Sequence, residues 1–215
     1  MIFADRREAG RSLASALASE PFVRDAARVV VLAIPRGGIP VGAEVARALG
    51  APLDVAIARE LRAPHDPDIP FGVVGADDYV EVDEDTVERL GLSEAEVAAE
   101  VDRRTAAVKR RLALYREALE EPSLEDAVAI VVDDGVASGG TARRACELAW
   151  REGAAHVVLA APLAALDAEE ALADVTDRVV VLTYPDEFLS VGQAYLDFPR
   201  LSDEELLELL RAIVR

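Results

Sequence analysis

Short apolar runs rich in β-branched residues alternate along the chain with segments of helical periodicity. Five such runs carry few charges and span residues 28–34, 53–58, 128–132, 156–161 and 178–184. Strands that are buried on both faces of a parallel sheet have this composition. Helical patterns over residues 38–49 and 141–152 each end before a glycine, as helices commonly do. The alternation predicts an α/β fold with a doubly wound, mainly parallel sheet of about five strands.

Three segments fall outside this alternation. Residues 5–18 have the pattern of an amphipathic helix. Residues 93–121 predict a long helix, because Ser93 and Glu96 form a capping box and the apolar residues that follow recur on one face. Residues 61–82 are interpreted as a loop, because three prolines interrupt them.

The whole chain, residues 1–215, is therefore expected to form one domain with two additions. Residues 59–121 are expected to be an inserted flexible loop followed by the long helix. Residues 184–215 hold four aromatic residues and then an acidic helix capped at Ser202.

The charge balance narrows the possible partners. The chain has 23 Lys+Arg against 41 Asp+Glu, a net charge of −18, and 52% of its residues are hydrophobic. A chain with this hydrophobic content is expected to fold, with its charged residues on the surface. A surface this negative repels duplex nucleic acid and anionic membranes, so neither is an expected partner. An acidic surface with Lys109 as the one lysine also suits a salt-rich cytosol, which is a hypothesis that salt-dependent folding can test.

Few residues are available for redox or metal chemistry. Cys146 is the one cysteine, and His65 and His156 are the two histidines. This excludes an intrachain disulfide and a cysteine-cluster metal site. The first residues lack a signal-peptide pattern. The longest apolar stretch, residues 154–166, is too short to span a membrane. We expect a cytoplasmic location.

The strongest chemical signal is AIVVDDGVASGGT at residues 129–141. Asp133 and Asp134 end an apolar strand, where their carboxylates can accept hydrogen bonds from a pair of ribose hydroxyls. Gly139 and Gly140 let the backbone approach a phosphate at the start of the next helix. The alternative is an ordinary strand–turn–helix with capping residues.

Two weaker signals follow the first two strands. Arg36 lies in IPRGGIP, and its guanidinium can pair bidentately with phosphate oxygens. The spacing is not GxGxxG, so a dinucleotide site is not indicated. Arg59 opens the segment RELR, in which Glu60 and Leu61 separate it from Arg62. The alternative for the first motif is a tight turn with an exposed arginine. The alternative for the second motif is the end of a strand with solvated charges.

Together these motifs resemble the signature of type I phosphoribosyltransferases, which is four apolar residues, two acids and a small hydroxyl-containing loop. The resemblance extends over nearly the whole chain, to an uncharacterised subgroup of predicted phosphoribosyltransferases. This chain departs from the family pattern at Gly135, where most members carry an aliphatic residue. It also departs at Glu60, where many members carry a basic residue, and Arg62 could compensate for that loss of positive charge. The resemblance implies a hood built from the N- and C-terminal segments.

The resemblance also implies residue roles towards phosphoribosyl diphosphate (PRPP). Asp133 and Asp134 would bind the ribose hydroxyls and, partly through ligand and water, Mg²⁺; with Arg36 they would be the catalytic residues. The implied 5′-phosphate loop consists of Ala137, Ser138, Gly139, Gly140 and Thr141. The implied pyrophosphate site consists of Arg36, Gly37, Gly38 and Arg59. Phe188 and Val191 would contact the base, although Phe188 could equally belong to the hydrophobic core.

The function implied is that of a Mg²⁺-dependent glycosyltransferase, which moves ribose 5-phosphate from PRPP to a nitrogen nucleophile and releases diphosphate. A nucleobase is the expected acceptor. Family members are commonly homodimers, so a homodimer is expected here. The alternative is a non-catalytic regulatory module of the same fold that binds PRPP or a nucleotide.

Overall fold

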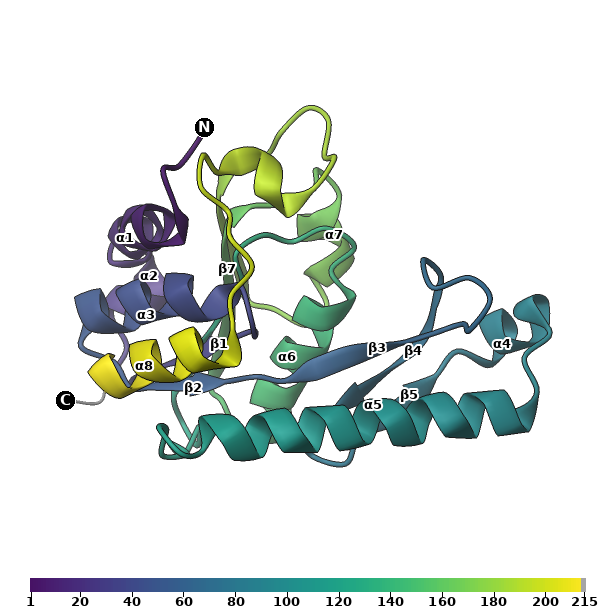
Figure 1. Cartoon of the computed structure of the whole chain (residues 1–215). Helices are drawn as coiled ribbons and strands as arrows, with labels where there is room; N and C mark the ends of the chain where they lie inside the picture. The colour runs from purple at the N-terminus through teal and green to yellow at the C-terminus, as the bar shows by residue number, and fades with distance from the viewer. Residues whose placement is uncertain (214–215) are drawn as a thin grey trace. The chain divides into compact units, whose positions relative to one another are not determined.

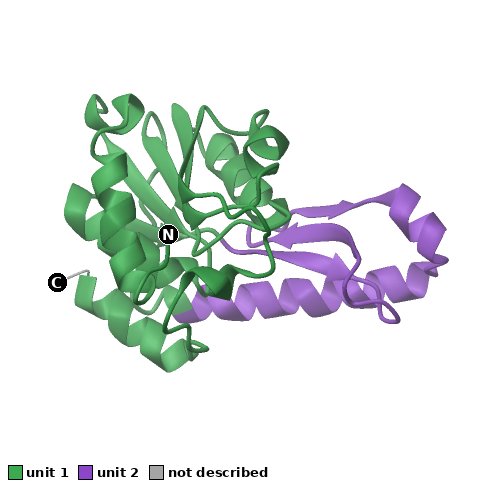
Figure 2. Cartoon of the chain, turned by 90° about the horizontal axis from the view of Figure 1, so that it is seen from above, with its two compact units in different colours: residues 1–56, 115–215 green, residues 57–114 purple. Residues whose placement is uncertain are grey.

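The computed structural model describes residues 1–213 and divides the chain into two compact units. Unit 1 comprises residues 1–56 and 115–215, and unit 2 comprises residues 57–114; Figure 2 shows them in different colours. Among the described residues, no helix has the length and apolar character needed to cross a membrane.

Unit 1 is built on a five-stranded parallel sheet with the strand order β2-β1-β6-β7-β8. Its strands are β1 (Val29–Ala33), β2 (Leu53–Val55), β6 (Val128–Val132), β7 (His156–Leu163) and β8 (Arg178–Thr183). All five residues of the central strand β6 are buried, as its unbroken apolar sequence predicts. The predicted α/β fold with a mainly parallel sheet is confirmed. The second strand is shorter than predicted, because a new strand of unit 2 begins at Ala58.

Helices cover both faces of this sheet. They are α1 (Arg6–Leu17), α2 (Pro21–Arg24), α3 (Gly38–Leu49), α6 (Gly140–Arg151), α7 (Ala168–Leu172) and α8 (Asp203–Ile213), with a 3₁₀ turn at Val191–Ala194. Figure 1 shows α1, α3 and α8 on one side of the sheet and α6 and α7 on the other. The predicted cap of α8 is present: Ser202 Oγ accepts a hydrogen bond from the Glu205 amide at 3.2 Å, and the Glu205 carboxylate accepts one from the Ser202 amide at 2.8 Å.

Unit 2 corrects the expectation of a loop over residues 61–82. Strands β3 (Ala58–Arg62), β4 (Pro70–Gly75) and β5 (Val80–Val82) form an antiparallel sheet in the order β3-β4-β5. The prolines do not prevent the sheet, because Pro64 and Pro67 lie between β3 and β4, and Pro70 is the first residue of its strand, where proline is tolerated.

Two helices complete unit 2: α4 (Glu84–Leu90) and α5 (Glu94–Tyr115). The predicted capping box at Ser93 and Glu96 is present, with the Glu96 carboxylate 2.9 Å from the Ser93 amide nitrogen. The helix ends at Tyr115, earlier than the predicted end at residue 121. The amides of residues 118 and 119 both donate to the Tyr115 carbonyl at 3.0 Å, which closes the chain into a turn.

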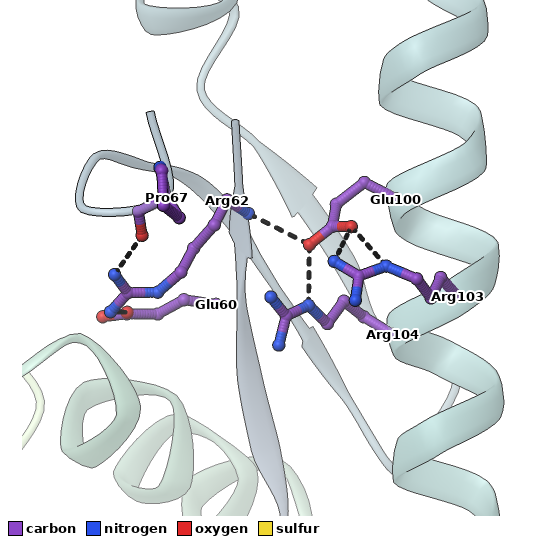
Figure 3. Close-up of polar contacts among 6 residues, drawn as sticks. All are labelled: Glu60, Arg62, Pro67, Glu100, Arg103 and Arg104. Carbon is purple, nitrogen blue, oxygen red and sulfur yellow. Dashed lines mark hydrogen bonds and ion pairs between the residues drawn. The ribbon is translucent and has the colours of Figure 1, made fainter. Parts of the chain in front are cut away.

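A buried carboxylate ties α5 to β3 within unit 2. Glu100 is 5% exposed, and its carboxylate accepts hydrogen bonds from Arg103, Arg104 and the Arg62 amide (Figure 3). Burial opposes the charged form, but the hydrogen bonds from these arginines outweigh it and lower the pKa of Glu100. Arg103 and Arg104 therefore stabilise the charged form of the carboxylate that joins α5 to the Arg62 amide of β3.

Candidate active site

The two motifs that lie far apart in the sequence meet at the carboxyl edge of the parallel sheet. Strands β1 and β6 are neighbours, although β2 is the next strand after β1 in the chain. Their crossovers leave in opposite directions, and this switch point is where open α/β sheets form ligand sites. A Cβ added to Gly38 would lie 2.5 Å from the Val132 carbonyl oxygen, and one added to Gly37 would lie 2.0 Å from Asp134 Oδ2. Only glycines allow the two loops to approach so closely.

The Asp134 carboxylate is paired with Arg6, a residue from the first turn of α1. Arg6 Nε donates a hydrogen bond to Asp134 Oδ2 at 2.7 Å, and the two side chains are 10% and 13% exposed. The Tyr195 hydroxyl donates to the Asp134 backbone carbonyl at 2.6 Å. Burial raises the pKa of Tyr195, so this hydroxyl remains protonated and continues to donate. Both ends of the chain therefore contact the predicted acid pair.

Sequence reasoning missed Arg6 and Tyr195 as residues of this site. Arg6 also donates from Nη1 to the Pro199 carbonyl at 3.0 Å, and its guanidinium lies 3.7 Å from the centroid of the Phe198 ring. The opening and closing segments had no assigned chemistry in the motifs, and no periodicity links residue 6 to residue 134. The one available signal was an arginine in a chain with few cations.

The predicted phosphate loop is open to solvent at Ala137 and Ser138. Gly139 has φ +78°, a left-handed conformation that favours glycine, and α6 begins at the next residue. The N-terminus of this 12-residue helix presents unsatisfied backbone N–H groups and a partial positive charge towards the loop. These features suit an anion, because both favour negative charge at the same place.

Arg36 precedes Gly37, the residue packed against Asp134, and its side chain is held by the C-terminal segment. Its Nη1 donates to the Leu201 carbonyl at 2.8 Å, and its Nη2 lies 3.2 Å from Asp203 Oδ1. Arg59 lies in β3 of unit 2, where its side chain donates to the Ala58 carbonyl at 3.2 Å. Its role at the pyrophosphate stays a prediction. The site described from unit 1 therefore contains the acid pair, the phosphate loop and Arg36.

Comparison with known proteins decides the family. A family model described as "Phosphoribosyl transferase domain" matches residues 7–198. This chain belongs to the phosphoribosyl transferase domain family. Two relatives from Mycobacterium tuberculosis strains CDC 1551 and H37Rv, each named "Putative phosphoribosyl transferase", are 39% identical to this chain over 209 residues. The match covers 97% of this chain and 46% of each relative, so the chain spans about half the length of the curated relatives it matches.

Solved structures agree with this family fold. The crystal structure of the protein TT1426 from Thermus thermophilus has a TM-score of 0.82 and 34% sequence identity, with 99% of both chains covered. A hypothetical protein from Neisseria gonorrhoeae, whose structure contains ppGpp, has a TM-score of 0.51 and 12% identity, and covers 98% of this chain and 96% of its own. The second likeness concerns the fold alone.

The predicted base-contacting residues of this phosphoribosyl transferase domain lie in a small apolar cluster. Phe188 and Val191 are partly buried and pack against a group that includes Phe3 and Tyr195. A Cβ added to Gly135 would lie 2.7 Å from Val191 Cγ1. A Cβ there would also lie 2.7 Å from Leu163 Cδ2, so a side chain larger than hydrogen would collide with both Leu163 and Val191, which accounts for glycine at this position. The contact of both residues with a base stays a prediction.

Asp133 and Asp134 carry carboxylate oxygens, the type of ligand that Mg²⁺ prefers. Within residues 1–213, no group of three or more His, Cys, Asp or Glu side chains could hold a metal ion. Mg²⁺ commonly binds through one or two carboxylates together with waters and substrate phosphates. The carboxylates of Asp133 and Asp134 fit that mode, with the remaining ligands coming from outside the protein.

Proposed function

We propose that this chain acts as a Mg²⁺-dependent phosphoribosyltransferase that moves ribose 5-phosphate from PRPP to a nitrogen nucleophile of the nucleobase class and releases diphosphate. The observation that carries the proposal is the packing of the Asp134 carboxylate against Gly37, which joins the acid pair to the loop after β1. Carboxylates can accept hydrogen bonds from sugar hydroxyls, and the backbone amides of the adjacent loops can bind phosphates. Together these groups match the parts of a phosphorylated sugar.

In this proposal each part of the donor has its own group of residues. Asp133 and Asp134 accept hydrogen bonds from the ribose 2′ and 3′ hydroxyls. The 5′-phosphate lies against the amides of residues 137–141, at the N-terminus of α6. The diphosphate lies against Arg36, Gly37 and Gly38, with Arg59 as a further cation. Phe188 and Val191 face the base.

The proposed reaction depends mainly on positioning and charge. The bond between ribose C1 and the diphosphate oxygen breaks, and its electron pair leaves with diphosphate. A bond forms between C1 and the nucleophile nitrogen, and solvent water takes up the proton that this nitrogen loses. Arg36 pairs with oxygens of the leaving diphosphate, where negative charge increases. The carboxylates beside the sugar favour the positive charge that develops on its ring. Bound Mg²⁺, held by Asp133 and Asp134, would supply charge neutralisation for the diphosphate.

The test is release of diphosphate from PRPP in the presence of Mg²⁺ across a panel of nucleobases. We expect at least one base to support release, and Asp133→Asn to reduce it strongly, because the amide cannot replace the charge. Arg24→Gln is a matched control, since Arg24 is 58% exposed and pairs with Asp25 at the surface. No release with any base would contradict the enzyme proposal.

A second candidate function is a non-catalytic module that binds PRPP or a nucleotide. It is favoured by the engagement of Arg36 with Leu201 and Asp203, and of Asp134 with Arg6, which a ligand must exchange or share. Tight PRPP binding measured by calorimetry, together with no diphosphate release for any base, is the result expected of such a module.

A further inference from the structure

A pocket at the loop after β1 is lined by three arginines from three separate parts of unit 1. Its volume is about 380 Å³, which is within the size range of small-molecule sites. Arg6 comes from α1, Arg36 from the loop after β1, and Arg200 from the segment before α8. The other four lining residues are a glycine, a phenylalanine, a proline and a leucine. Among these described residues there is no carboxylate, although acids outnumber bases 41 to 23 in the chain.

A neighbouring pocket does not share this absence of carboxylates. It has a volume of about 400 Å³ and shares Arg6, Pro199 and Leu201 with the first pocket. Its wall also includes four carboxylates, those of Asp5, Asp197, Glu205 and Glu208. Two adjoining hollows of similar size therefore differ in charge, and only the one at Arg36 is suited to an anion.

The Arg200 side chain is uncommitted. It is exposed and makes no hydrogen bond or ion pair with any other residue in the part of the chain that the structure describes. In a chain with a net charge of −18, an arginine without a carboxylate partner beside two other arginines has no evident structural use. A phosphate oxygen is the partner that a guanidinium best matches in charge and geometry.

Arg6 and Arg36 both retain capacity for a ligand. The described hydrogen bonds of Arg6 use Nε and Nη1, which leaves its Nη2 group for another acceptor. Arg36 donates from Nη1 to the Leu201 carbonyl, and its Nη2 forms an ion pair with Asp203 in which both side chains are more than one third exposed. Exposed ion pairs contribute little to stability, so a phosphate can replace Asp203 on Arg36 at small cost.

We propose that Arg6 and Arg200, one from each terminal segment, complete with Arg36 the pocket that receives the diphosphate group of the donor. The inference rests on the proposed function, which assigns Arg36 alone of the three to diphosphate. Neither Arg6 nor Arg200 belongs to the two loop motifs to which the resemblance assigns phosphate chemistry, residues 34–40 and 129–141. The N- and C-terminal segments would therefore bind the donor and not only cover it.

The experiment measures binding of magnesium diphosphate and of ribose 5-phosphate to the full chain by calorimetry. Arg200→Gln is the main variant, because Arg200 is exposed and its replacement leaves packing unchanged. We expect it to weaken diphosphate binding about 10-fold, the effect of losing one charge-assisted hydrogen bond at an exposed site, and to leave ribose 5-phosphate binding unchanged. Arg24→Gln should change neither affinity.

Three outcomes would overturn the inference: unchanged diphosphate affinity in Arg200→Gln, an equal loss for both ligands, or a wild-type protein that binds no diphosphate. A loss confined to diphosphate supports it. The proposed function is judged separately, by diphosphate release from PRPP. If the wild type releases diphosphate from PRPP and Arg200→Gln changes neither affinity, only the inference is refuted. If Arg200→Gln weakens diphosphate binding alone but no diphosphate is released from PRPP, only the enzyme proposal is refuted.

Discussion

Neutralising Asp134 tests whether the acid pair is also part of the scaffold. Asp134→Asn keeps the shape of the side chain but leaves the buried Arg6 without its anion. Removing one partner of a buried ion pair costs about 3–5 kcal/mol. The two side chains keep 10% and 13% exposure. We therefore expect the lower end, about 3 kcal/mol of unfolding free energy.

This loss is large enough to measure by thermal unfolding. For a chain of this size, 1 kcal/mol shifts Tm by roughly 2–4 °C, so the variant should melt about 6–12 °C below the wild type. Circular dichroism of the full chain at fixed salt follows the transition. Arg24→Gln, which breaks an exposed ion pair, should change unfolding by less than about 0.5 kcal/mol.

The double variant Arg6→Met/Asp134→Asn separates stability from binding. It removes both charges, so most of the lost stability should return, since a buried ion pair can be replaced by uncharged groups at little cost. PRPP binding should be lost already in Asp134→Asn, because the missing carboxylate serves the ribose, and it should not return in the double variant. An Asp134→Asn variant within about 1 kcal/mol of wild-type stability would refute the reasoning that Arg6 needs this anion.

The remaining predictions concern packing, pH and salt. Gly135→Val should cost about 1–3 kcal/mol in denaturant unfolding by colliding with Val191, and Val191→Ala should recover part of that loss; an equal cost in both backgrounds contradicts the collision. Glu100→Gln should lower Tm at pH 7. The difference in Tm between wild type and variant should shrink as pH falls below 4.5 through the lowered pKa of Glu100, because wild-type Glu100 then loses the charge that binds Arg103 and Arg104. A difference in Tm that is independent of pH contradicts this. Raising salt from dilute buffer to about 1 M should raise Tm by screening the charge of −18, and full stability in dilute buffer contradicts a salt-adapted surface.

The sequence by itself determined the parallel sheet and the motifs on it. Strand β6 is the run Val128–Val132, and it is apolar because both of its faces are covered by helices. Local rules also located the helix starts at Ser93 and Ser202, since a capping box depends on residues three apart in the chain. The loop predicted over residues 61–82 was wrong, because the effect of proline on a strand depends on its position in the ladder.

Only the tertiary structure decided which residues surround the acid pair. Arg6 and Asp134 are 128 positions apart, and their ion pair exists because α1 packs beside the carboxyl edge of the sheet. The same packing brings Tyr195 to the backbone of Asp134 and Arg200 to the pocket of Arg36. No local pattern records such contacts, because they depend on strand order and on how the two terminal segments cross the sheet edge.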